Sequence, residues 1–261
     1  MAQQQAMPAA YEQPLNERIR TLLRLEFLFQ EIDWALNGDS PWHSRQSVAT
    51  LLDILSVLSS RGDIRGELIK ELERIAGSLE RLRHNPDVDS ARLQPLLEDC
   101  RRLAAALKSV RGLPGSELKN NDLLNGVMQR AGIPGGTCSF DLPAYQHWLL
   151  QPAAERRAQL QAWFGPLETL QQATALVLRL LRESAEPESL VARDGLFQQS
   201  PDRSASYQLI RVLLPADAPY FAEISGSKYF FTVRFLQQRE TGERPVQTRD
   251  DVAFQLCRCG L

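Results

Sequence analysis

The chain has 261 residues, 43% of them hydrophobic, and a formal net charge of −2 at pH 7. This length supports one large domain or two smaller domains with cores of their own. The near-neutral charge excludes a bulk electrostatic field that draws the protein to nucleic acid or to a membrane surface. Four cysteines are too few for a disulfide scaffold, and neither a signal peptide nor a long apolar run stands out, so a cytoplasmic location is expected.

The N-terminal tenth of the sequence contains a predicted disordered segment and then a long helix. Residues 1–10, MAQQQAMPAA, are small and polar and are predicted to be disordered. The stretch 11–34 carries two apolar stripes at helical spacing, and Pro14 followed by Asn16 and Glu17 is typical of a helix start. One stripe contains Leu15, Leu22, Leu25, Phe29, Ile32 and Leu36, and the other contains Ile19, Leu23, Phe27 and Trp34. Two stripes indicate a central helix that is covered on two sides.

Helical patterns continue to about residue 188. Asp63 is expected to cap a helix that follows the break at 61–63, and that helix and the next, at about 90–111, are predicted to form an antiparallel hairpin. Prolines mark the first turns of further helices near 143–150, 153–163 and 166–184. The segment 137–142 is interpreted as a short strand.

After residue 188 the apolar period changes from helical to extended. Strands are predicted near 195–198, 207–214, 220–224, 229–236 and 252–257, joined by short links rich in turn residues. Consecutive short strands of this kind are typical of an antiparallel sheet. The predicted fold class is therefore α+β, with an N-terminal all-helical domain over 11–188 followed by a smaller antiparallel β-sheet domain over 189–261. Segments near 9–13 and 137–142 are candidates to join that sheet.

Motifs for catalysis or metal binding do not emerge from the sequence. It has three histidines and no HExxH, GxSxG, Walker loop or GxGxxG. Cys257 and Cys259 suggest zinc, but zinc takes four ligands, and Cys100, Cys138 and the histidines are not paired at ligand spacing. The sequence therefore predicts no enzyme, no cofactor and no metal site, and the two terminal cysteines are expected to be reduced and partly exposed.

The remaining candidates for function are basic residues. Arg61, Arg65 and Lys70 lie near the helix start at Asp63, Lys119 and Arg130 flank a short helix, and Lys228, Arg234 and Arg239 lie on one β ribbon. Because side chains alternate along a strand, Lys228 and Arg234 are expected to face away from a core-facing set that includes Phe231 and Phe235. Such a basic face beside Phe230 suits an acidic or mixed peptide. A nucleic-acid or small-ligand binding module that uses the same patch is the alternative, although no RNP-type or zinc-knuckle signature supports RNA.

Four stretches of the sequence resemble the ZapD family of cell-division proteins. They are YEQPLNERIRTLLRLEFLF at 11–29, RGDIRGELIKELER at 61–74, IPGGTCSFDLPAYQHWL at 133–149 and ISGSKYFFTVRF at 224–235. These stretches are long, of unusual composition, and spread over nearly the whole chain. Cys257 and Cys259 are also similar to the family's paired terminal cysteines, with Arg258 inserted between them.

The resemblance implies a bacterial cytoplasmic homodimer with a helical and a β domain. Such a dimer binds the C-terminal tail of the tubulin-like GTPase FtsZ, is recruited to midcell by FtsZ, and cross-links and bundles FtsZ filaments to promote Z-ring assembly and stability. The resemblance implies neither nucleic acid nor membrane as a partner. By motif, the tail-binding residues are Arg61 or Arg65, His147, Lys228 and Arg234, with Lys119 a weaker match because ELKNNDLL departs from the family's arginine-rich version. None of them is implied to be catalytic.

Overall fold

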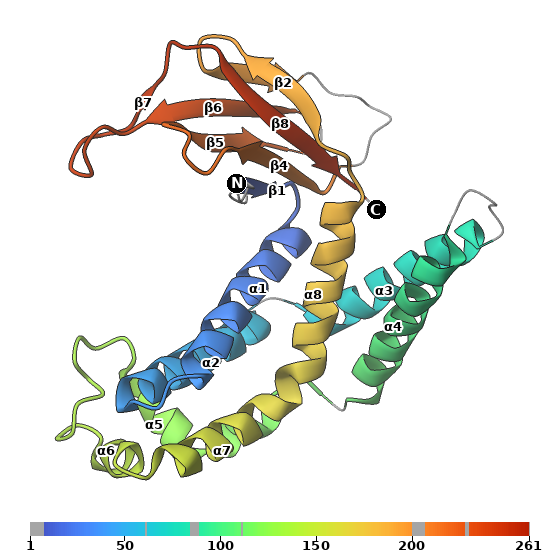
Figure 1. Cartoon of the computed structure of the whole chain (residues 1–261). Coiled ribbons are helices and arrows are strands. Elements are labelled where there is room, and N and C mark those ends of the chain that lie inside the picture. The colour runs from blue at the N-terminus through green and yellow to red at the C-terminus, as the bar shows by residue number, and fades with distance from the viewer. Residues whose placement is uncertain are drawn as a thin grey trace, which may run out of the picture. The chain divides into compact units, whose positions relative to one another are not determined.

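The structure is a computed structural model that describes residues 8–60, 62–83, 89–110, 112–199, 207–227 and 230–260 (Figure 1). Its helices are α1 (Glu17–Leu36), α2 (Pro41–Ser60), α3 (Ile64–Leu82), α4 (Ser90–Ser109), η1 (Ser116–Asn120), α5 (Asp122–Arg130), α6 (Pro143–Leu149), α7 (Ala153–Phe164), η2 (Gly165–Leu167) and α8 (Glu168–Glu183). Its strands are β1 (Ala9–Pro14), β2 (Glu188–Ala192), β3 (Leu196–Gln199), β4 (Leu209–Leu214), β5 (Phe221–Gly226), β6 (Phe231–Gln237), β7 (Val246–Gln247) and β8 (Val252–Cys259). The α+β fold class, helical and then antiparallel β, is confirmed.

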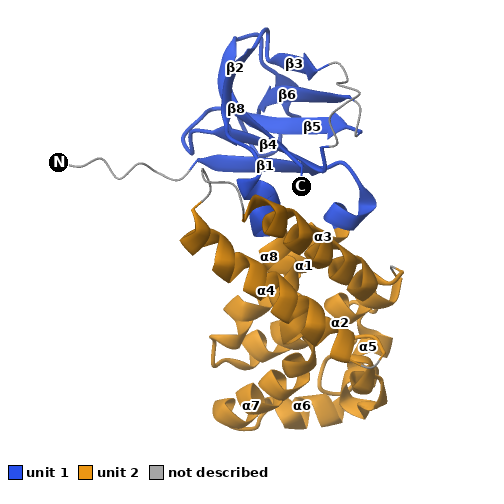
Figure 2. Cartoon of the chain, turned by 90° about the vertical axis from the view of Figure 1, so that its right-hand side faces the viewer, with its two compact units in different colours: residues 1–20, 178–261 blue, residues 21–177 orange. Residues whose placement is uncertain are grey.

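The chain forms two compact units (Figure 2). Unit 1 contains Met1–Arg20 and Leu178–Leu261, and unit 2 contains Thr21–Val177. Unit 2 is helical, and within it α3 and α4 pack against each other as the predicted antiparallel hairpin. The cap predicted at the start of α3 is also confirmed, since the Asp63 carboxylate accepts a hydrogen bond from the Gly66 amide at 2.9 Å.

The candidate strand near 9–13 and the helix start signalled by Pro14, Asn16 and Glu17 are both confirmed. Residues 9–14 form strand β1, which pairs with β4, and α1 begins at Glu17. The Asn16 side chain accepts a hydrogen bond from the Ile19 amide at 2.9 Å and so caps the helix at the predicted start. Ala9 and Ala10 therefore belong to a strand rather than to a disordered segment, while residues 1–7 lie outside the described residues.

The two apolar stripes of α1 have different surroundings. The first is largely buried, and its buried members are Leu22, Leu25, Phe29 and Ile32. In the second stripe Ile19 is buried, but Phe27 and Trp34 are 65% and 63% exposed. The prediction that α1 is covered on two sides is therefore wrong for the part of the helix that carries these two aromatic side chains.

Unit 1 is built around two antiparallel sheets rather than one. One sheet has the strand order β1-β4-β8-β2, and the other has the order β3-β6-β5 with β7 paired to β6. Side chains from both sheets share one core, in which the Phe254 ring lies 5.0 Å from Phe235 and 5.4 Å from Phe197, centroid to centroid. Sheet pairs with a common apolar interior form sandwiches. The predicted strands are found near their expected positions, whereas β2 and β7 were not predicted and 137–142 consists of turns instead of a strand.

The cysteines near the end of the chain lie inside unit 1. Cys257 and Cys259 belong to β8, a central strand of the first sheet, and both are buried, so the predicted partly exposed terminus is wrong. Burial raises the pKa of the Cys259 thiol to about 12, with a smaller contribution from Cys257. Burial also raises the pKa of Cys257, against the opposing charge of Arg211. Both groups are held as neutral thiols, the unreactive form.

A thiol-reactive probe such as Ellman's reagent is therefore expected to distinguish the four cysteines. Cys138 is partly exposed and should react within the native protein, whereas Cys100, Cys257 and Cys259 are buried and should react only after unfolding. The measurement is a time course of thiol labelling with and without denaturant, with mass mapping of the labelled sites. Rapid native labelling of Cys257 or Cys259 would contradict the burial described for β8.

Candidate partner-binding surfaces

The eight predicted binding residues are divided between the two units. Arg65, Lys119, Arg130 and His147 belong to unit 2, and Arg234 and Arg239 belong to unit 1. Arg61 and Lys228 lie outside the described residues. The six described residues also differ in what their side chains contact, and these contacts separate exposed cations from those already engaged within the fold.

Arg65 is engaged with backbone carbonyl groups. Its guanidinium donates to the oxygen atoms of Val110 and Gly112, the latter at 2.7 Å. These bonds join the start of α3 to the chain just after α4, where the last carbonyl groups of a helix lack intrahelical partners. In the described structure Arg65 therefore stabilises the α3–α4 hairpin.

Arg130 is engaged in an ion pair. Its guanidinium lies 2.7 Å from the Asp141 carboxylate, which also accepts a hydrogen bond from the Cys138 thiol at 3.4 Å. The pair joins the end of α5 to the turns that precede α6. The charge of Arg130 is thus partly neutralised inside unit 2, although 41% of its side chain stays accessible.

Lys119 is among the residues that line a pocket of unit 2, about 600 Å³ in volume. The pocket is lined mostly by apolar side chains, among them Leu55, Leu113, Leu118 and Met128. Lys119 is exposed, and its ammonium has no hydrogen-bond or ion-pair partner within the described parts of the chain. His147, on α6, is likewise exposed and without a side-chain partner among the described residues.

Arg234 lies on the face of the β ribbon opposite the core, as predicted. Phe231, Val233 and Phe235 are buried and Arg234 is exposed. Arg234 is not an isolated cation, because its guanidinium lies 2.7 Å from the carboxylate of Glu223, its neighbour across the β5–β6 ladder. Arg239 follows the end of β6 and is exposed, with no side-chain partner in the described ranges.

A partly buried ion cluster in unit 1 was not predicted from the sequence. The Glu12 carboxylate accepts two hydrogen bonds from Arg182, both at 2.9 Å, and one from Arg211 at 2.7 Å. Burial alone would raise the pKa of Glu12, but the hydrogen bonds and charges of Arg182 and then Arg211 outweigh it, so the pKa lies below its ordinary value of 4.5. The three groups lie far apart in the sequence, and the pairing of β1 with β4 places Glu12 opposite Arg211.

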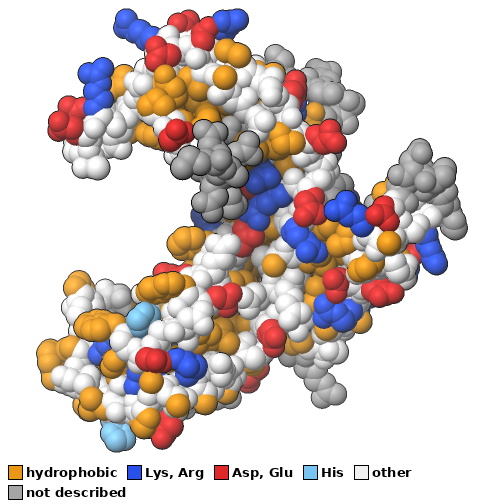
Figure 3. Space-filling view, in the orientation of Figure 1, with side chains coloured by type: hydrophobic (Ala, Val, Ile, Leu, Met, Phe, Trp, Pro, Cys, Tyr) orange, Lys and Arg blue, Asp and Glu red, His pale blue; other side chains and the backbone are white. Residues whose placement is uncertain are grey.

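An exposed aromatic surface of unit 2 was also missed. Phe27, Trp34, Trp42 and Phe140, here called the aromatic face, are 63–83% exposed. Figure 3 shows hydrophobic side chains gathered at one end of the helical unit. The signal was present in the sequence, since Phe27 and Trp34 lie seven residues apart on the second stripe of α1, but that stripe was interpreted as covered.

Two further features of the described residues bear on the type of site. No group of three or more His, Cys, Asp or Glu side chains is placed there to hold a metal ion. Among the described helices, none combines the length and the apolar composition needed to cross a membrane. The surface features described above are exposed cations, an apolar pocket and the aromatic face, which are typical of binding surfaces.

Comparison with known proteins identifies the family. The model of the family described as "ZapD: Cell division protein" matches residues 23–234, which is more than half of the chain. A protein named cell division protein ZapD from Methylococcus capsulatus is 45% identical over 251 residues, covering 96% of this chain and 98% of the relative. Relatives of the same name from Cupriavidus pinatubonensis and Aromatoleum aromaticum are 42% and 39% identical, and at least 96% of each chain is covered. The chain therefore belongs to the ZapD family of cell division proteins.

Proposed function

We propose that this protein binds the C-terminal tail of FtsZ and, as a homodimer, cross-links and bundles FtsZ filaments during assembly of the Z-ring. The observation that carries the proposal is the similarity, over nearly the full length of both chains, to relatives named cell division protein ZapD. In this proposal the protein acts in the cytoplasm, is recruited to midcell by FtsZ, and catalyses no reaction. Exposed cations and an apolar pocket on the described surface support a role in binding a peptide.

Cross-linking needs only modest affinity at each site. A dimer presents two tail sites to a filament that carries many tails, so binding of the second tail becomes intramolecular. Effective concentrations of order mM then raise the avidity by about 100-fold or more over that of one site. Because the proposed contacts are between exposed charges, they should weaken with salt, since screening at physiological ionic strength acts over about 8 Å.

The residues proposed to contact the tail are the predicted basic set, ranked by availability. Lys119, His147 and Arg239 are exposed and unpaired within the described chain, so they rank first. Arg234 is exposed but shares its charge with Glu223. Arg65 and Arg130 rank lower because they are engaged within unit 2. Arg61 and Lys228 remain candidates from the sequence alone.

The test of the proposed function uses purified full-length protein and FtsZ filaments. The wild-type protein is expected to co-sediment with filaments, to bundle them in light scattering, and to bind an FtsZ tail peptide. The double variant Lys228→Glu/Arg234→Glu is expected to keep its circular dichroism spectrum and lose bundling. If the wild-type protein binds neither filaments nor peptide, the proposal is overturned. Undiminished bundling by the variant would show that the ribbon residues do not contact the tail.

The ion pair on the ribbon offers a pair of single variants with opposite expected effects. Arg234→Glu should weaken tail binding about tenfold, because a carboxylate would then face an acidic segment. Glu223→Gln should strengthen it, because the carboxylate that competes for Arg234 is removed. Fluorescence anisotropy of a labelled tail peptide at low and high salt measures both affinities. Equal affinities for the two variants and the wild-type protein would show that Arg234 lies outside the tail site.

The same titration can separate a peptide module from a nucleic-acid module. In a parallel titration, a labelled single-stranded RNA with the same net charge as the tail peptide replaces the peptide. Capture of the RNA with no capture of the peptide would reverse the assignment in favour of nucleic acid. Selective capture of the peptide, with salt dependence, is the expected result.

A further inference from the structure

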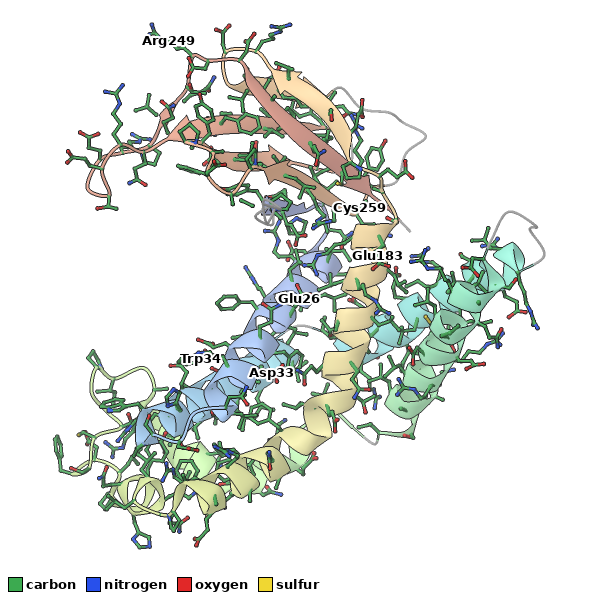
Figure 4. The ribbon with its side chains drawn as sticks, in the orientation of Figure 1. Glu26, Asp33, Trp34, Glu183, Arg249 and Cys259 are labelled. Atoms are coloured by element: carbon green, nitrogen blue, oxygen red, sulfur yellow. The ribbon has the colours of Figure 1, made fainter. Side chains whose placement is uncertain are left out.

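The pocket of unit 2 that Lys119 lines is formed by three elements of the helical unit. Its lining comes mainly from α2, from η1 with the residues just before it, and from α5. Its volume of about 600 Å³ lies within the range of small-molecule sites, about 300–1,000 Å³. The aromatic face, whose member Trp34 is labelled on α1 in Figure 4, takes no part in the lining. The pocket is therefore a separate feature of the surface.

The buried part of the lining is aliphatic. Leu58, Leu118 and Leu124 are at most 7% exposed. Met128 is 54% exposed, and its unbranched, flexible side chain can adapt to a ligand. The described lining contains no aromatic side chain, so it offers no flat surface on which a planar ring could stack. An aliphatic group is therefore the apolar part of a ligand that fits this pocket.

Two side chains of opposite charge belong to the same lining. Asp53 on α2 and Lys119 on η1 are both exposed. Within the described ranges, neither side chain forms a hydrogen bond or an ion pair, either with the other or with a third residue. A ligand with a single charge would be attracted by one of them and repelled by the other. A ligand that carries one charge of each sign would complement both.

The surroundings of Asp53 favour a positive group. Burial raises the pKa of Asp53, and the negative charge of Glu31 raises it further. Glu31 accepts hydrogen bonds from the side chains of Gln46 and Thr50, each at 3.0 Å, and no described cation is paired with it. An ammonium group beside Asp53 would therefore be attracted by two carboxylates.

The remaining polar groups of the lining are neutral donors and acceptors. The Asn125 amide donates to the Lys119 carbonyl oxygen at 2.7 Å, and the Ser59 hydroxyl donates to the Ser56 carbonyl oxygen at 3.0 Å. Hydroxyl and amide groups can both donate and accept, so they suit a ligand with N–H and C=O groups along its length. A peptide backbone has these groups, whereas a fatty acid has one polar end.

We propose that this pocket binds short aliphatic peptides with free termini. The aliphatic side chains lie against the leucines of the lining, the terminal carboxylate is held by Lys119, and the terminal ammonium group is held by Asp53. This site adds a small-molecule ligand to the proposed function and does not depend on it. Lys119 is also a proposed tail contact, so the peptide and the FtsZ tail would compete for its ammonium group.

The first test varies the ligand. Isothermal titration calorimetry of the full chain with the tripeptide Leu-Ala-Leu measures the reference affinity. Acetylation of its N-terminus or amidation of its C-terminus should each weaken binding about three- to fivefold, the effect of losing an ion pair that is exposed to solvent. Triglycine keeps both charges and lacks the aliphatic side chains, so it should bind more than about tenfold more weakly. Equal binding of the free and the doubly blocked tripeptide would overturn the proposal.

The second test assigns each terminus to one side chain. With Lys119→Gln, the free and the amidated tripeptide should bind equally, while acetylation should still weaken binding. With Asp53→Asn, the free and the acetylated tripeptide should bind equally, while amidation should still weaken binding. Lys70→Gln, which changes an exposed lysine of α3 outside the lining, is the control and should preserve both differences. A loss of affinity that is the same for every form of the peptide would contradict the assignment.

The third test locates the ligand. The chain has three methionines, and Met128 is the one among the described residues. In protein labelled with ¹³C at the methionine methyl groups, the Met128 signal, assigned with Met128→Leu, should shift as the tripeptide saturates the site. Ser56→Phe, at an exposed position of the lining, should block the pocket and abolish this shift. Gln129→Phe, exposed on α5 outside the lining, should preserve it.

The outcomes separate this inference from the proposed function, because all three tests use the protein alone. Tripeptide binding with the expected pattern supports the peptide site even if the wild-type protein binds no FtsZ tail. Tail binding without saturable tripeptide binding up to about 1 mM overturns the peptide site and leaves the proposed function standing. Saturable binding that leaves the Met128 signal unchanged would place the ligand elsewhere and overturn the inference as well.

Discussion

Glu12→Gln is expected to lower the free energy of unfolding of unit 1 by about 3 kcal/mol, the low end of the range for breaking a buried ion pair. The substitution leaves Arg182 and Arg211 close together without their shared carboxylate. The low end applies because 17–24% of the three side chains is still exposed. Glu12 lies on β1, Arg211 on β4 and Arg182 near the end of α8, so the cluster joins the helix end to two strands of the first sheet.

The measurement can be restricted to unit 1. All four tryptophans lie in unit 2, whereas Cys257 and Cys259 lie in the sheet that carries Glu12. In a Cys100→Ala/Cys138→Ser background, labelling of the two remaining thiols against urea concentration therefore reports the unfolding of that sheet. Glu223→Gln is the matched control, because the Glu223–Arg234 pair is about half exposed and should contribute no more than about 1 kcal/mol.

The stabilisation by Glu12 should depend on pH in a defined direction. Its pKa is lowered in the folded protein, so its contribution is fully present above the ordinary value of 4.5 and is lost as the pH falls through the lower folded pKa. The difference in stability between wild-type protein and Glu12→Gln should therefore be constant near neutral pH and shrink below about 4.5. A difference that stays constant through the acidic range would show that the carboxylate charge does not stabilise the fold.

Local signals predicted much of this fold. The caps and prolines that punctuate the helices act over a few residues, so Asp63, Pro143 and Pro152 were interpreted correctly from the sequence. The core face of β6 was also correct, because a period of two depends only on neighbours along one strand. Strand β1 could be named only as a candidate near 9–13, because pairing with a strand about 200 residues later decides the conformation of residues 9–14.

The surfaces were less predictable than the elements. A stripe of apolar residues shows which face of a helix is apolar, but not whether another part of the same chain covers it. Phe27 and Trp34 were predicted to be covered, and both are exposed. Basic residues could be found by type, but Arg65 and Arg130 are engaged by groups 11 to 47 residues away. Cys259 was placed at a free end because its position in a central strand depends on pairing with Leu209.

Gly195→Ala is expected to destabilise unit 1 by about 2–3 kcal/mol, the cost of holding a side chain in a strained backbone conformation. Asp194 and Gly195 have φ values of 48° and 67° and form the two-residue turn between the bridged residues Arg193 and Leu196, which joins β2 to β3. Positive φ values at both positions are typical of an Asp-Gly hairpin. An added Cβ at Gly195 would lie 2.6 Å from the Thr248 carbonyl oxygen, a backbone atom that cannot turn away.

This link matters because β2 belongs to one sheet of the sandwich and β3 to the other. The Gly195 carbonyl also accepts a hydrogen bond from the Phe235 amide at 2.9 Å, so movement of the turn would disturb a core residue of β6. Gly242→Ala, in the turn between β6 and β7, is the control, since its Cβ would meet nothing within 4 Å. We expect the urea midpoint of thiol exposure to fall for Gly195→Ala and to stay unchanged for Gly242→Ala; equal midpoints would mean that the turn tolerates a side chain and that the two sheets do not depend on its conformation.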